Sequence, residues 1–191
     1  MVLRASLLSV LLICFLTFAV FADPPPKDLK ITSKAFPNVA DNSWTMLEFS
    51  VQPAGEYYLE MTDLTGSNIG CWGAVGDKYA DGTAYQDGEP LTGDFRMQYT
   101  PEGEAVVELI VIPPQGAITD DWHPFGLHDA QESIGQTFKA PKAFVAAGFQ
   151  TPTWNTANSG CTMTLYSAAE QSAIGSVGKI ASSWGRIKSQ N

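Results

Sequence analysis

Aromatic, acidic and amide side chains gather in two polar stretches of this 191-residue chain. The first stretch covers residues 72–94 and the second covers residues 151–160. A sugar presents an apolar face of C–H groups and a rim of hydroxyls, so a sugar-binding site needs an exposed ring with carboxylates or amides beside it. Both stretches offer that mixture. The candidate ligand-binding residues are Trp72, Tyr79, Tyr85, Asp94, Trp154 and Asn155.

A core position is the alternative for Trp72 and Trp154, because tryptophan is usually well buried in folded proteins. A buried indole cannot stack on a sugar. The solvent exposure of these two side chains therefore separates a binding module from a purely structural domain.

Metal sites and cofactors are not predicted. Asp77, Asp81 and Asp87 lack the spacing of an EF-hand loop, and the last two precede glycines, as is typical of hairpin turns. His123 and His128 share no face of a helix or strand with nearby aspartates, which argues against a zinc site. A structural calcium held by backbone oxygens stays open.

No catalytic signature is present in the sequence. The chain has no nucleophile elbow, P-loop, dinucleotide-binding fingerprint or zinc-protease motif. Two carboxylates could still meet in space for glycoside cleavage, but nothing indicates a particular pair. We therefore expect a protein that is not an enzyme.

The amino terminus is typical of an exported protein. Arg4 precedes a short apolar run, and small residues lie before Asp23, so residues 1–22 are predicted to be a signal peptide. Residues 23–27 are a proline-rich leader. The net charge of −9 disfavours nucleic acid and anionic membranes as partners, and we expect no membrane association after cleavage.

Export makes a disulfide between Cys71 and Cys161 chemically feasible, since oxidising compartments allow such bonds. The bond would close a long loop and could contribute roughly 4 kcal/mol in the chain-entropy model. Two buried free thiols are an equally good interpretation.

Short alternating segments indicate an all-β domain over residues 28–167. Cys161, Met163 and Leu165 share one face of a strand, and residues 145–150 form an apolar strand suited to the interior of a sandwich. Two alternating runs around residues 53–55 predict a hairpin. The apolar run at residues 105–112 is expected to be a central strand.

Two blocks of the sequence resemble galactose-binding-like jelly-roll modules, which occur in bacterial extracellular proteins, often beside glycoside hydrolases. Gly135-Gln136-Thr137-Phe138 through Cys161-Thr162-Met163-Thr164-Leu165-Tyr166 resembles their opening half. The block from Ala35-Phe36-Pro37-Asn38-Val39 through Gly93-Asp94-Phe95 resembles their closing half. The resemblance implies a jelly-roll β-sandwich of the carbohydrate-binding kind.

The order of the two halves departs from the family, because the closing half comes first. The chain is then either one circularly permuted module or an out-of-phase piece of a tandem array. Residues 30–33 and 179–182 are weakly similar and would compete for one strand position. We expect residues 29–36 to take that position and residues 168–191 to form a weakly structured tail.

These observations predict a secreted, non-catalytic module that binds carbohydrate or another cell-surface polymer. The alternative is a structural or interaction domain on the cell surface, a remnant of a tandem array, with a protein partner.

Overall fold

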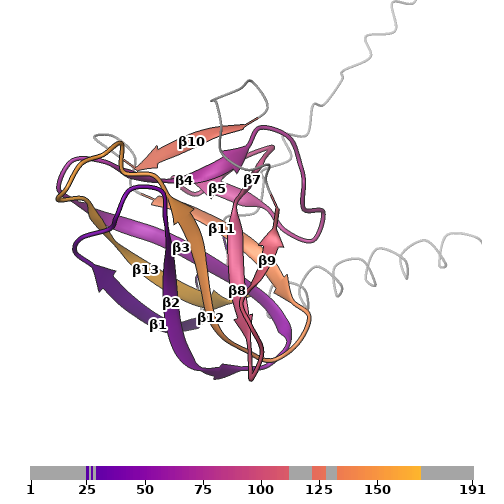
Figure 1. Cartoon of the computed structure of the whole chain (residues 1–191). Helices are drawn as coiled ribbons and strands as arrows, with labels where there is room; N and C mark the ends of the chain where they lie inside the picture. Colours follow the sequence, from indigo (N-terminus) through magenta and orange to yellow (C-terminus); the bar gives the residue numbers. More distant parts are fainter. Residues whose placement is uncertain (1–24, 26, 28, 112–121, 128–132, 169–191) are drawn as a thin grey trace, which may run out of the picture.

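The computed structural model describes residues 25, 27, 29–111, 122–127 and 133–168 (Figure 1). In this part of the chain every regular element is a β-strand, and all paired strands are antiparallel. The all-β prediction is thereby confirmed. None of these residues forms a helix long and apolar enough to cross a membrane.

The strands form three sheets. The largest has the order β1 (Leu29–Phe36), β13 (Gly160–Ser167), β3 (Gly55–Thr65), β11 (Ser133–Ala140), β5 (Ala84–Gln86) and β6 (Glu89–Pro90). The second has the order β2 (Ser43–Gln52), β12 (Phe144–Thr151), β8 (Met97–Pro101) and β9 (Val107–Ile110). The third has the order β10 (Trp122–Leu127), β4 (Ile69–Ala74) and β7 (Asp94–Phe95).

The six-stranded and four-stranded sheets pack face to face in a sandwich-like arrangement (Figure 1). Their inner faces follow the period-two patterns of the sequence. On β3, Leu59 and Met61 are fully buried, and they pair across to Leu165 and Met163 of β13, which are also fully buried. Phe144 of β12 lies at the centre of this core. Its ring centroid lies 4.8 to 6.2 Å from the rings of Phe49, Tyr57, Tyr99 and Phe138.

The first strand takes the position that the sequence predicts for it. β1 pairs with β13 along its whole length, from Leu29 opposite Ser167 to Phe36 opposite Cys161. This pairing covers one edge of β13, whose other edge pairs with β3. An uncovered edge would leave a row of backbone groups unpaired.

The predicted hairpin around residues 53–55 is wrong. β2 and β3 follow each other in the sequence, but β2 pairs with β12 and β3 pairs with β13 and β11, so the chain crosses from one sheet to the other at this turn. Alternation shows which face of a strand is apolar, but it carries no information about the neighbouring strand.

The prediction that residues 105–112 form a central strand is also wrong for residues 105–111, which the structure describes. β9 lies at the edge of the four-stranded sheet and pairs only with β8 among the described strands. The side chains of Val106, Val107 and Val111 are 51%, 42% and 65% exposed.

Some predictions fall on residues that the structure does not describe. These are the signal peptide, much of the leader, most of the connection between β9 and β11, and the tail after Ala168.

Candidate functional site

Two loops meet at one end of the sandwich and enclose a shallow pocket. The connection from β1 to β2 and the connection from β12 to β13 lie beside each other at this end (Figure 1). The pocket has a volume of about 390 Å³. Its polar lining comes from Asn38, Asp41, Thr153, Asn155 and Thr156.

Trp154 lies in the chain between two of these lining residues, and its side chain is 41% exposed. Its φ is 51° and that of Asn155 is 60°, so both residues adopt the left-handed conformation. This conformation is uncommon for residues other than glycine and is an outlier for a bulky one. Such strain persists only where surrounding contacts impose it, and it gathers at binding and active sites.

Asp41 fixes the residue that precedes Trp154. Its Oδ1 accepts a hydrogen bond from the backbone N–H of Thr153 at 2.6 Å and a second from the Thr153 hydroxyl at 3.3 Å. Its Oδ2 accepts from the Nδ2 of Asn42 at 2.7 Å. Thr153 is fully buried, so the loop that carries Trp154 is fixed at its base.

Trp72 of β4 is not beside Trp154 on the surface. It is 9% exposed, and its Nε1 donates to the Oδ1 of Asn42 at 2.7 Å. This burial leaves no open indole face for a ligand. Trp72 instead contacts the connection from β1 to β2 directly, through Asn42, and is linked to the connection from β12 to β13 through Asn42 and Asp41.

Asp77 and Asp94 line a second pocket, of about 340 Å³. The backbone of Tyr79 is bound to Asp94, while the Tyr79 hydroxyl contacts the backbone of Lys139. Asp94 is 2% exposed. Its Oδ2 accepts from the backbone N–H groups of Lys78 and Tyr79 at 2.7 and 2.9 Å, and its Oδ1 accepts from the Nε2 of Gln136 at 3.0 Å. The carboxylate therefore holds the loop after β4 in place, and three protein donors already contact it.

Tyr85 lies on the outer face of the six-stranded sheet. It is 8% exposed, and its ring packs edge-on against Tyr58 with centroids 5.7 Å apart. The six predicted residues thus fall into four groups: Trp154 with Asn155, Trp72, Asp94 with Tyr79, and Tyr85. Only Trp154 and Asn155 combine surface exposure with a polar pocket.

Sequence reasoning missed Asn38 and Asp41 as pocket residues. The sequence places both in a turn rich in asparagine and aspartate, which is ordinary turn chemistry. A turn pattern indicates local backbone conformation. It does not indicate that the turn lies against a loop more than a hundred residues away.

Cys71 and Cys161 are both buried free cysteines in the structure. Burial raises the pKa of the Cys161 thiol to about 12. Burial, and then the proximity of Cys161, raises the pKa of the Cys71 thiol well above its usual value. The two thiols are therefore close enough to influence each other, and a disulfide between them stays a prediction.

Within the described residues, no group of three His, Cys, Asp or Glu side chains could hold a metal ion. Asp87 and Gly88 have φ values of 54° and 83° and form the turn between β5 and β6. The Oδ1 of Asp87 accepts from the backbone N–H of Ser133 at 3.0 Å. His128 lies outside the described residues, as does the side chain of His123.

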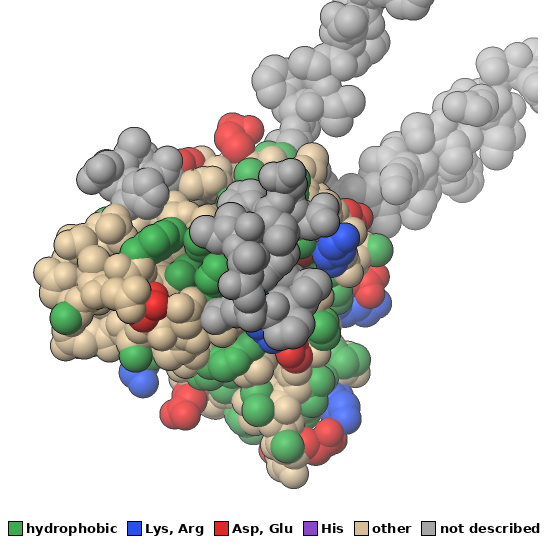
Figure 2. Space-filling model, turned by 45° about the horizontal axis from the view of Figure 1, so that its top comes forward, with side chains coloured by type: hydrophobic (Ala, Val, Ile, Leu, Met, Phe, Trp, Pro, Cys, Tyr) green, Lys and Arg blue, Asp and Glu red, His purple; other side chains and the backbone are tan. Residues whose placement is uncertain are grey.

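On the face in Figure 2, most of the described surface is uncharged polar or hydrophobic, and acidic and basic side chains are scattered over it. The chain matches no protein-family model, and no curated protein or solved structure is significantly similar to it.

Proposed function

We propose that this chain is a secreted, non-catalytic module that binds carbohydrate through Trp154 and the adjoining pocket. The exposed indole of Trp154, held in a left-handed conformation beside polar side chains, carries the proposal. An aromatic ring can stack on the C–H face of a sugar, while amides and carboxylates bind its hydroxyls.

Preorganisation supports the same conclusion. Asp41 fixes Thr153 by two hydrogen bonds, so the loop does not have to be ordered when a ligand binds. Asn155 lies on the same loop and lines the pocket, where its amide can donate to and accept from sugar hydroxyls. Secretion is part of the proposal and rests on the apolar amino-terminal run followed by small residues.

The finer fold that we propose is a galactose-binding-like jelly roll with its halves in permuted order. The pairing of β1 with β13 supports it, because the strand before the closing half completes the sheet of the opening half. The termini of a sandwich often lie close together, which makes permutation feasible.

Affinity-gel electrophoresis against plant, algal and microbial polysaccharides tests the function. We expect at least one polysaccharide to retard the wild-type protein. Trp154→Ala should weaken that retardation about tenfold or more, since a loss of ~1.4 kcal/mol is tenfold in affinity. Val51→Ala, which truncates another exposed side chain, is the matched control and should bind as the wild type does. Binding that survives Trp154→Ala unchanged would place the ligand elsewhere.

A structural or interaction domain is the second candidate function. The burial of Trp72 and the three exposed valines at the β9 edge favour it, because an apolar edge strand can pair with a partner chain. Val107→Lys should then abolish capture of a protein partner and leave polysaccharide binding unchanged.

A further inference from the structure

Two polar side chains on the outer face of the six-stranded sheet are as well buried as the core. Along β3, Leu59 and Met61 point into the sandwich, and the alternate residues Tyr58 and Glu60 point away from it. Tyr58 is nevertheless 0% exposed and Glu60 is 2% exposed. The alternation of β3 places both on the face away from the core, so their burial requires contacts from other parts of the chain.

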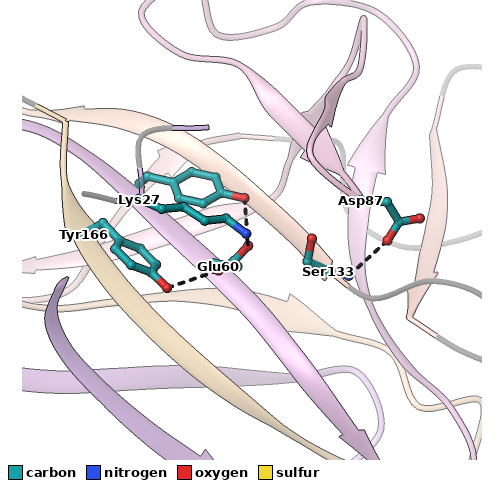
Figure 3. Close-up of polar contacts among 6 residues, drawn as sticks. Lys27, Glu60, Asp87, Ser133 and Tyr166 are labelled. Carbon is teal, nitrogen blue, oxygen red and sulfur yellow. Dashed lines mark hydrogen bonds and ion pairs between the residues drawn. The ribbon is translucent and has the colours of Figure 1, made fainter. Parts of the chain in front are cut away.

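Three groups converge on the Glu60 carboxylate, as Figure 3 shows for Lys27 and Tyr166. The Nζ of Lys27 lies 2.6 Å from Oε1. The hydroxyl of Tyr166 donates to Oε2 at 3.3 Å, and the hydroxyl of Tyr58 approaches Oε1 at 3.5 Å. The carboxylate is thus surrounded by one ammonium group and two phenol groups.

The aromatic walls of this site are fixed by packing. The ring of Tyr58 lies between Tyr85 and Tyr166, with centroid distances of 5.7 and 6.0 Å. Gly135 on β11 makes room for it, because a Cβ at that position would come within 2.3 Å of the Tyr58 hydroxyl oxygen. The sheet therefore holds the rings whether or not the ammonium is present.

The ammonium is the one member of the group that the sheet does not hold. Lys27 precedes β1 and belongs to the proline-rich leader, and its side chain is 45% exposed while that of Glu60 is 3% exposed. A buried carboxylate is strongly disfavoured without a cation close by.

We propose that Glu60, Tyr58 and Tyr166 form a binding site for a primary alkylammonium group, which Lys27 of the leader fills and which accepts an external amine when Lys27 is withdrawn. The leader is then a tethered competitor for an amine ligand at the outer sheet face. This site is separate from the Trp154 pocket, and its ligand is defined by the ammonium rather than by sugar hydroxyls. The amine can come from a lysine side chain or from an amino sugar.

Titrations of the tyrosine ring NMR signals with two amines test the proposal. n-Butylammonium represents a lysine side chain, and glucosamine represents an amino sugar. Lys27→Ala should show saturable shifts of the Tyr58 and Tyr166 signals at millimolar amine. The wild-type protein should need at least tenfold more amine, and neutral n-butanol should cause no such shift.

The variant Lys27→Ala with Glu60→Gln keeps the shape of the site without its charge and should not respond. Response to n-butylammonium alone identifies a lysine-type ligand, and response to both amines extends the ligand class to amino sugars. The proposal is overturned if the double variant responds to the amines as strongly as Lys27→Ala does. It is also overturned if Lys27→Ala responds to neither amine. Should Lys27→Ala fail to fold alone, n-butylammonium is expected to restore its tyrosine signals, and failure to do so also overturns it.

Discussion

The indole Nε1 of Trp72 donates to the Oδ1 of Asn42 at 2.7 Å, and the Nδ2 of Asn42 donates to Asp41 at 2.7 Å. One asparagine thus connects a buried tryptophan of β4 to the aspartate that fixes the Trp154 loop. The Oδ1 of Asn42 accepts from the buried indole, and its Nδ2 donates to the carboxylate that holds the Trp154 loop. A change at Asn42 should therefore affect stability and, under the proposed function, carbohydrate binding as well.

Asn42→Gly tests this connection. Glycine accepts the left-handed φ of 57° at this position but removes the acceptor of a buried N–H group, which should cost about 1–3 kcal/mol of unfolding free energy. Urea unfolding measures the loss. Asn155→Gly is the matched control, because it makes the same change at another left-handed position, where φ is 60°. Equal unfolding midpoints for Asn42→Gly and the wild type would contradict the prediction.

Asp94→Ala should destabilise the protein more than Asp77→Ala does. Asp94 is buried and accepts hydrogen bonds from Lys78, Tyr79 and Gln136. In the described part of the chain, the Oδ1 of Asp77 accepts only from the N–H of Tyr79, at 3.1 Å. Loss of the Asp94 carboxylate leaves several buried donors without an acceptor, at a cost of about 1–3 kcal/mol for a single buried group. Chemical denaturation compares the two variants, and equal effects would show that Asp94 does not hold this loop.

Deletion of residues 28–36 should cost several kcal/mol of unfolding free energy, on the scale of two or three buried apolar side chains. The deletion removes β1 and exposes the edge of β13 along its length. Deletion of residues 169–191 should cost little, because Ala168 and its hydrogen bond to Glu56 at 2.9 Å are retained. Thermal unfolding compares the two truncations. The reverse order of stability would contradict the single-module interpretation.

Stability should fall as the pH rises above about 8.5. The pKa of the Cys161 thiol is raised to about 12, and that of Cys71 is raised well above its usual value, while an unfolded thiol titrates near ~8.5. The unfolded chain then releases protons that the folded chain keeps. The stabilising contribution is complete below about pH 8.5 and is lost as the pH rises toward the folded pKa of about 12.

The expected loss is up to about 1.4 kcal/mol per pH unit for each thiol. Urea unfolding between pH 7 and 9.5 measures it before most tyrosines titrate. The double variant Cys71→Ala with Cys161→Ala is the control and should show a flatter dependence. Identical slopes for the two proteins would mean that the thiols do not titrate, as in a disulfide.

Local pattern predicts the faces of strands well in this chain and their neighbours poorly. Cys161, Met163 and Leu165 are buried on one face as the alternation indicates, because the period of two is a property of each strand by itself. The change of sheet between β2 and β3 depends on which distant strands compete for each edge. The sequence of the turn at residues 53–55 does not show which strands pair with β2 and β3.

The same limit applies to the site. The sequence identifies the loop that carries Trp154, because a tryptophan among threonines and asparagines is conspicuous. It does not reveal the left-handed backbone there, nor the contact with Asp41, which depends on tertiary packing. Nor does it reveal the burial of Glu60, whose partner Lys27 comes from a segment outside the strand.

The pairing of Leu29 with Ser167 joins the two ends of the domain, so β1 can pair only after β13 is available. A nascent chain that lacks β13 does not yet contain the strand with which β1 pairs. Contacts so distant along the chain are formed against a large loss of chain entropy, and domains dominated by them fold in milliseconds to seconds, slower than helical domains. Closure of the β1 edge should accordingly come late in folding, and translation alone cannot complete this domain from its amino-terminal half.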